Sequence, residues 1–114
     1  QRARSAWKDK ERVQGWQLDD AARKVIIEAG YEKYIRHRTG HSLSPGPMVH
    51  GLGMNLDNLE THDTREMLPG IGFTIEPGIY LPEFGVRLEI NLFIDPDKGP
   101  TITSCNQEDI VLLA

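Results

Sequence analysis

The sequence predicts an α+β fold in which two helices precede an antiparallel sheet. Apolar residues recur at helical spacing in the first 30 positions, and they alternate with polar residues from Gly70 onward. The 114 residues are 39% hydrophobic and 26% charged, which is typical of one globular domain. No repeat, low-complexity segment or linker divides the chain, so we expect a single domain over residues 1–114.

The first predicted helix covers residues 2–14, where apolar side chains form a narrow stripe and Gly15 is expected to end the helix. The second runs from Asp19 and Asp20, whose negative charges suit a helix start, to Gly30, which suits the position just past its end. Its predicted apolar face consists of Leu18, Ala21, Ala22, Val25, Ile26 and Ala29.

The middle of the chain changes character. Residues 31–43 contain tyrosines and histidines without a helical stripe, so we expect an extended segment. Residues 44–69 are rich in Gly, Pro, Asn and Asp and predict a long loop. A loop of that length inside a compact domain is uncommon and usually has a function.

The last third predicts strands. In "GFTIE", Phe73 and Ile75 point to one face while Thr74 and Glu76 point to the other. In "VRLEINLFI" the apolar residues from Val86 to Ile94 alternate with Arg87, Glu89 and Asn91. The segments "TITS" and "IVLLA" are expected to complete the sheet.

Two carboxylates, Glu76 and Glu89, are therefore predicted on the non-core faces of their strands, and they can converge if the two strands are neighbours. Carboxylates that lie close together need a cation or a shared proton, so either Arg87 or a metal ion could balance them. In "HRTGH", His37 and His41 would point the same way on an extended segment. One histidine with two glutamates suits Mn, Zn, Co or Fe, but a glutamate that pairs with an arginine is a common structural motif, and the spacing alone does not exclude it.

Charge and composition narrow the classes of function. A formal net charge of −4 argues against a nucleic-acid partner, which usually meets a basic surface. The apolar runs are too short to cross a membrane, and a single cysteine, Cys105, cannot form an internal disulfide. A reducing, cytoplasmic compartment is therefore expected.

The motifs "HRTGH" and "GIGFTIEPGIYLPEFGVRLEIN" closely resemble the C-terminal part of the catalytic domain of Xaa-Pro aminopeptidases and Xaa-Pro dipeptidases. These enzymes have the pita-bread fold shared with methionine aminopeptidase and creatinase. The resemblance runs from about Gly15 to the C-terminus. It implies the C-terminal half of a pita-bread domain, with helices packed on a curved antiparallel sheet, and metal-dependent hydrolysis of the bond between an N-terminal residue and proline.

The resemblance also implies roles for individual residues. His41 and Glu76 would bind metal, and Glu89 would bridge two divalent ions, with Mn expected and Co, Zn or Fe as alternatives. Arg87 would orient Glu89, and His37 would hold the substrate. Two aspartate ligands of the family match no segment here, so the chain would supply three of five ligands and act poorly alone.

The loop histidine His50 is the implied proton shuttle. The segment "HSLSPGPMVHG" has about two residues more than the family pattern, including Pro45 and Pro47, which would move His50 away from the site. The implied partners are a peptide with proline in second position and either the remaining half of the domain or a second copy of the chain. A metal-free creatinase-like enzyme and a non-catalytic peptide- or protein-binding module are the alternatives.

Overall fold

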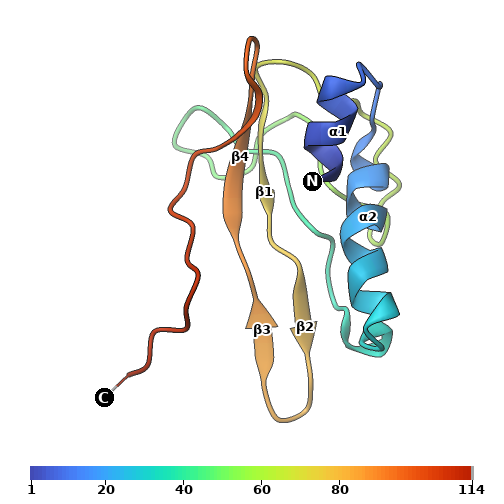
Figure 1. Cartoon of the computed structure of the whole chain (residues 1–114), viewed down its shortest axis with the longest axis vertical. Helices are drawn as coiled ribbons and strands as arrows, with labels where there is room; N and C mark the ends of the chain where they lie inside the picture. Colours follow the sequence, from blue (N-terminus) through green and yellow to red (C-terminus); the bar gives the residue numbers. More distant parts are fainter. Residues whose placement is uncertain (114) are drawn as a thin grey trace.

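A computed structural model describes residues 1–113 and shows two helices followed by short antiparallel strands, which confirms the α+β prediction (Figure 1). The elements are α1 (Arg2–Lys8), α2 (Gly15–Glu28), the 3₁₀ helix η1 (Glu32–Tyr34), β1 (Gly72–Ile75), β2 (Gly78–Tyr80), β3 (Gly85–Arg87), β4 (Ile90–Asp95) and β5 (Gly99–Ile102). None of these helices is long and apolar enough to cross a membrane.

The strands form two antiparallel sheets rather than the one curved sheet that was expected. One sheet has the order β1-β4-β5, and the hairpin β2-β3 forms the other. Both keep one register, because Ile75 pairs with Ile90 and Gly78 pairs with Arg87. The two sheets are therefore parts of one long ribbon whose ladder is interrupted between these pairs, as Figure 1 shows.

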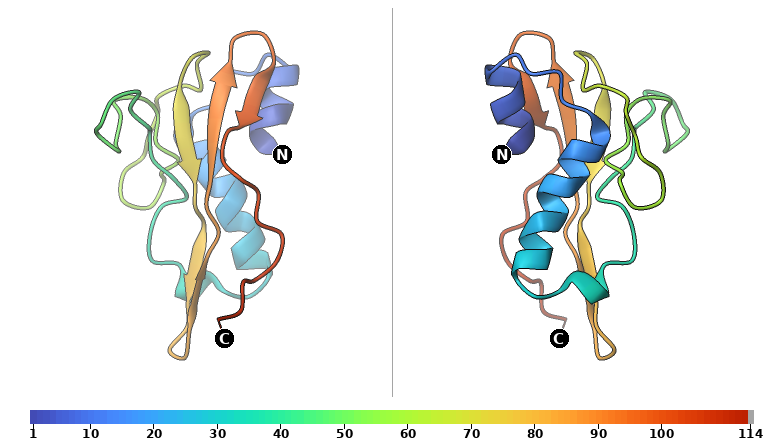
Figure 2. Two further views of the ribbon diagram at one scale, coloured as in Figure 1. Left: turned by 90° about the vertical axis from the view of Figure 1, so that its left-hand side faces the viewer. Right: turned by 90° about the vertical axis from the view of Figure 1, so that its right-hand side faces the viewer.

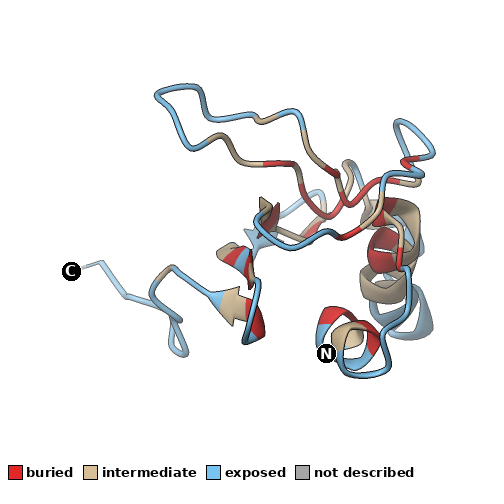
Figure 3. Ribbon diagram, turned by 90° about the horizontal axis from the view of Figure 1, so that it is seen from above, coloured by how far each residue is buried: buried red, intermediate tan, exposed pale blue. Residues whose placement is uncertain are grey.

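The core lies between the helices and one face of the larger sheet (Figure 3). Its fully buried centre includes Phe73 from β1 and Ile94 from β4, which meet Val13 and Met54 from the connecting segments. The 44–53 loop lies beside the β1 edge of this sheet and projects away from the helices (Figure 2). The segment that leads into the loop is bonded to β1, since Leu43 N donates to the Gly72 carbonyl.

The first helix ends earlier than predicted, and Gly15 begins the second helix instead of ending the first. The chain leaves α1 through Lys10, which adopts a φ of 54°, and Glu11 N donates to the Ala6 carbonyl. Gly15 then packs so closely that a Cβ there would lie 1.8 Å from the Asn55 carbonyl oxygen. This close approach, which only glycine allows, explains the residue better than a helix end does.

The end of the second helix matches the prediction. Gly30 follows the C-cap Ala29 and has a φ of 85°, a left-handed conformation that favours glycine. The predicted apolar face is only partly covered, because Leu18 is buried whereas Val25 is 67% exposed. The segment after the helix is extended as expected, apart from the short turn of η1.

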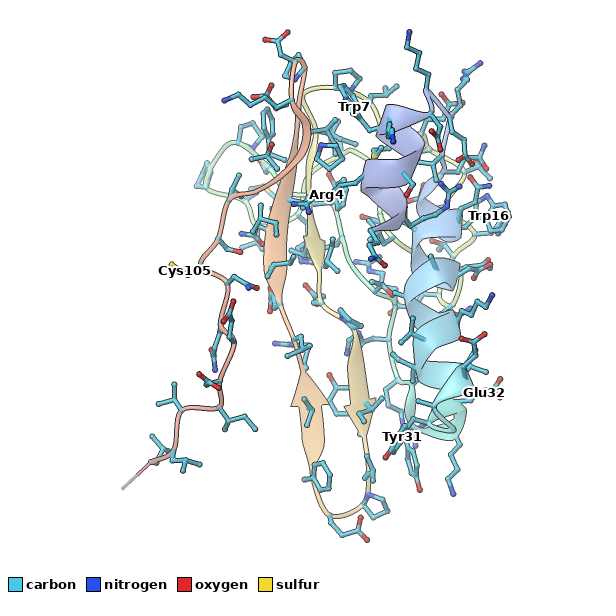
Figure 4. All side chains as sticks on the ribbon, viewed as in Figure 1. Arg4, Trp7, Trp16, Tyr31, Glu32 and Cys105 are labelled. Carbon is cyan, nitrogen blue, oxygen red and sulfur yellow. The ribbon has the colours of Figure 1, made fainter. Side chains whose placement is uncertain are left out.

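Two strand predictions need correction. The run from Val86 to Ile94 is broken at Leu88 and Glu89, and only its second half is buried on the core side. The stretch "IVLLA" forms no strand in residues 110–113, where its side chains are exposed because no neighbouring strand pairs with them, and Ala114 lies outside the described residues. Cys105 also lies exposed on this C-terminal segment, while Trp7 packs inward from α1 over β5 (Figure 4).

Candidate metal centre

The segment that contains the "HRTGH" motif lies alongside β1. Thr74 N donates to the His41 carbonyl at 2.9 Å, and His41 N donates to Thr74 Oγ1 at 2.9 Å. Two residues further along the chain from Thr74, Glu76 N donates to the Thr39 carbonyl at 2.6 Å. These backbone bonds place His41 and Glu76 side by side although 35 positions separate them in the sequence.

The side chains of His41 and Glu76 meet in a largely buried position. His41 Nε2 lies 3.5 Å from Glu76 Oε2, and the two side chains are only 11% and 17% exposed. On the other side of the ring, Nδ1 lies 2.9 Å from the Ser42 carbonyl oxygen. Because a carbonyl can only accept, Nδ1 carries a hydrogen, and a neutral ring then directs the lone pair of Nε2 toward the carboxylate.

Two acceptors that face each other need a cation between them. A proton on Nε2 would make an ion pair, and a divalent metal ion would use both atoms as ligands. The carbonyl that fixes the outer ring nitrogen is the arrangement that usually accompanies a metal-binding histidine. The geometry of this pair therefore fits a metal ion as well as it fits a proton.

Glu89 lies opposite Glu76 in the register of the ribbon, at the interruption between the two sheets. The pairs Ile75–Ile90 and Gly78–Arg87 fix this alignment on either side. The Glu89 carboxylate lies 3.7 Å from the Arg87 guanidinium, and both side chains are about half exposed. Such an exposed pair contributes little to stability because water screens it.

The three predicted ligands do not form one cluster in residues 1–113. No group of three or more His, Cys, Asp or Glu side chains in this part of the chain is arranged to hold a metal ion. His41 and Glu76 are together, whereas the Glu89 carboxylate is paired with Arg87. The donor types fit a divalent ion, and the assignment of all three as ligands stays a prediction.

His50 lies next to the His41–Glu76 pair. Its ring centroid is 4.1 Å from that of His41, with the planes at 63°. An antiparallel bridge between Leu43 and His50 closes the loop at its base. The residues between them project outward and are mostly exposed, so the additional residues enlarge the loop tip without carrying His50 away.

His37 is held by the β2–β3 hairpin. Its Nδ1 lies 2.7 Å from the Arg38 carbonyl oxygen and therefore carries the hydrogen. Its Nε2 then accepts from the Tyr80 hydroxyl at 2.6 Å. The sequence analysis did not predict a role for Tyr80. Tyr80 follows Glu76 by four residues, so in an extended chain the two side chains point to the same side, and this spacing could have suggested that Tyr80 lies near the site.

An open hollow lies beside His50 on the loop side of the larger sheet. Its apolar walls come from Leu43 and Met48 in the loop and from Ile71 and Phe93 on the sheet. The sequence analysis did not predict it, because the hollow depends on where the loop folds back.

The model of metallopeptidase family M24 matches residues 1–96, and the chain belongs to this family.

Among curated relatives, the chain is 42% identical over 97 residues to an Xaa-Pro dipeptidase of Lactobacillus delbrueckii subsp. lactis, with 84% of this chain and 25% of the relative covered. It is 37% identical over 97 residues to a probable dipeptidase PepE of Mycobacterium bovis, with 84% and 24% covered. The chain thus spans about a quarter of the length of the relatives it matches.

Solved structures agree with this placement. An X-Pro aminopeptidase from Thermotoga maritima superposes with a TM-score of 0.74 at 30% identity, covering 90% of this chain and 27% of that one. The prolidase from Pyrococcus horikoshii OT3 gives 0.71 at 34% identity, covering 87% and 27%. The two helices and antiparallel sheets therefore match one part of these pita-bread structures.

Proposed function

We propose that this chain carries part of the active site of a metal-dependent peptidase that cleaves between an N-terminal residue and a following proline. The observation that supports this most is the His41–Glu76 pair, whose Nε2 and Oε2 atoms face each other at 3.5 Å with the outer ring nitrogen already bonded. The related Xaa-Pro dipeptidases and the membership of family M24 support the choice of substrate.

Two divalent ions, held by His41, Glu76 and Glu89 with further ligands, would make hydroxide available near neutral pH and polarise the scissile carbonyl. The side chains around them have separate tasks. His50, beside His41, passes a proton to the leaving nitrogen. His37, fixed by Tyr80, holds the substrate, and Arg87 orients the Glu89 carboxylate. The apolar hollow beside His50 offers space for a peptide side chain.

Metal binding by the purified chain tests this proposal. We expect Mn²⁺ or Co²⁺ to bind in calorimetric titration, and we expect His41→Ala and Glu89→Ala to weaken binding by about tenfold or more. His62→Ala is the matched control, since His62 is exposed, stacks on Trp16 and bonds Asn58. Equal affinity in the His41 and His62 variants would contradict the proposed site.

Peptidase activity gives a second test. Because the chain offers three of the five ligands that the resemblance implies, we expect little cleavage of an Xaa-Pro dipeptide even with Mn²⁺ or Co²⁺ added. Vigorous cleavage by the 114-residue chain would show that its own residues complete the site. Binding of proline-containing peptides without any metal would instead favour the non-catalytic module.

We also propose that the chain associates with the rest of a pita-bread domain or with a second copy. Val25 on α2 is largely exposed and lines an apolar groove together with Ala21 and Ala22, which supports a covering partner. A monodisperse monomer in analytical sedimentation, with no binding of a dye for exposed apolar surface, would argue against this.

A further inference from the structure

Asp19 is a buried carboxylate that the proposed reaction does not use. It lies in the second turn of α2 and is fully buried, although the sequence analysis expected it at the start of the helix. A buried charge is costly unless donors surround it, so this residue requires a specific explanation.

The contacts of Asp19 reach two segments outside its own helix. Its Oδ1 accepts from Thr39 N at 3.1 Å and from Thr39 Oγ1 at 2.6 Å. Its Oδ2 accepts from Asn58 N at 2.6 Å, and the Arg23 guanidinium lies 3.7 Å away. Every partner is a donor, which matches a carboxylate that only accepts.

Thr39 connects this carboxylate to the His41–Glu76 pair. It lies between His37 and His41, and its carbonyl accepts from Glu76 N at 2.6 Å. Asp19 therefore holds Thr39 on one side while Thr39 holds the backbone of Glu76 on the other. Two residues further along, the backbone of His41 is bonded to Thr74.

We propose that Asp19 is a positioning residue for the His41–Glu76 pair. The inference rests on the proposed function. It means that α2, which carries Asp19, helps to position the two candidate ligands. Its carboxylate fixes Thr39 by two hydrogen bonds, and Thr39 sets the distance between the "HRTGH" segment and the end of β1. Loss of these bonds would let the two candidate ligands separate without removing either of them.

Asp19→Asn tests this with little change in volume. The asparagine side chain replaces one acceptor oxygen of the carboxylate with a donor nitrogen, which cannot accept a hydrogen bond from the donors that surround Asp19. Asp20→Asn is the matched control with the same change in charge, since Asp20 is partly exposed and accepts from the Asn58 side chain. Thr39→Val is a second variant that leaves the Asp19 carboxylate in place and removes the hydroxyl.

The first measurement is amide hydrogen exchange without metal. In Asp19→Asn and Thr39→Val, we expect exchange at Glu76 and His41 to accelerate about tenfold or more relative to Phe93 in the β4–β5 ladder, with no such change in Asp20→Asn. Equal acceleration throughout the chain, or none at Glu76, would overturn the proposal, whether or not the chain binds metal.

The second measurement is Mn²⁺ affinity of variants that remain folded by circular dichroism. We expect about tenfold weaker binding in Asp19→Asn and wild-type affinity in Asp20→Asn. If affinity depends on His41 but not on Asp19, the positioning role is wrong and the metal site stands. If the wild-type chain binds no Mn²⁺, the proposed function fails, and the exchange result alone decides the role of Asp19.

Discussion

Gly40 packs directly against Thr74, so that a Cβ at position 40 would lie 1.9 Å from the Thr74 carbonyl oxygen. This contact brings the segment containing His41 close enough to bond with β1, and Gly40 itself exchanges two backbone hydrogen bonds with Leu56. The closeness of two backbones thus sets the position of the candidate site.

Gly40→Ala is therefore expected to disrupt both the fold and the site. The new methyl group meets backbone atoms that cannot rotate away, so we expect a loss of at least about 2 kcal/mol in the free energy of unfolding. Gly46→Ala is the control, because a Cβ there meets no atom closer than 3.7 Å. Urea denaturation of both variants checks this, and equal stability would refute the close packing.

Phe73→Ala tests the core beneath the site. Phe73 is fully buried in β1 between the helices and the sheet, and its removal should cost about 3–5 kcal/mol. That is a large part of the total stability of a small domain. Phe84→Ala, at the exposed tip of the β2–β3 hairpin, should change the unfolding midpoint little. Thermal unfolding followed by circular dichroism compares them.

Local patterns in the sequence predicted some features and missed others. The period of α2 and the alternation around Phe73 reflect burial by nearby elements, so they could be read along the chain. The end of α1 could not be predicted in this way. Gly15 was expected to end that helix, but a glycine is needed there because the Asn55 carbonyl, which is distant in sequence, packs against it. The contact of Asp19 with Thr39 was hidden for the same reason, since a helix-start aspartate has an adequate local explanation.

The candidate site shows the same division. Alternation placed Glu76 and Glu89 on comparable strand positions, and the register does set them opposite each other. The interruption of the strand ladder at Leu88 and Glu89 could not be predicted, because apolar and polar residues alternate without a break from Val86 to Leu92. Where the Glu89 carboxylate points depends on nearby charges, and here Arg87 attracts it.

The buried carboxylate of Asp63 is expected to make the folded chain less stable in acid. Burial acts to raise the pKa of its carboxyl, but hydrogen bonds from Arg65 and from Asn55 N outweigh burial and lower the pKa below its usual value of 3.8. A lowered pKa in the folded state means that the stabilisation is present above about pH 4 and is lost as the pH falls through the folded-state pKa.

Asp63→Asn should consequently destabilise the chain by about 1–3 kcal/mol at pH 7, because it weakens charge-assisted hydrogen bonds. The difference from wild type should shrink as the pH falls below 4, where the native carboxyl also becomes protonated. Asp97→Asn, in the exposed turn between β4 and β5, provides the comparison. Urea midpoints measured from pH 7 to pH 3 would contradict the argument if the difference stayed constant.

Tyr80→Phe tests how His37 is held. The Tyr80 hydroxyl donates to Nε2 while the ring's Nδ1 donates to the Arg38 carbonyl, so both nitrogens are occupied and the tautomer is fixed. Loss of the hydroxyl should cost about 1 kcal/mol and release Nε2. In ¹⁵N spectra of the imidazole, we expect the Nε2 resonance of His37 to shift in Tyr80→Phe. In Tyr31→Phe, which alters an exposed ring beside η1, it should stay in place. An unchanged resonance in both variants would mean that Tyr80 does not fix this histidine.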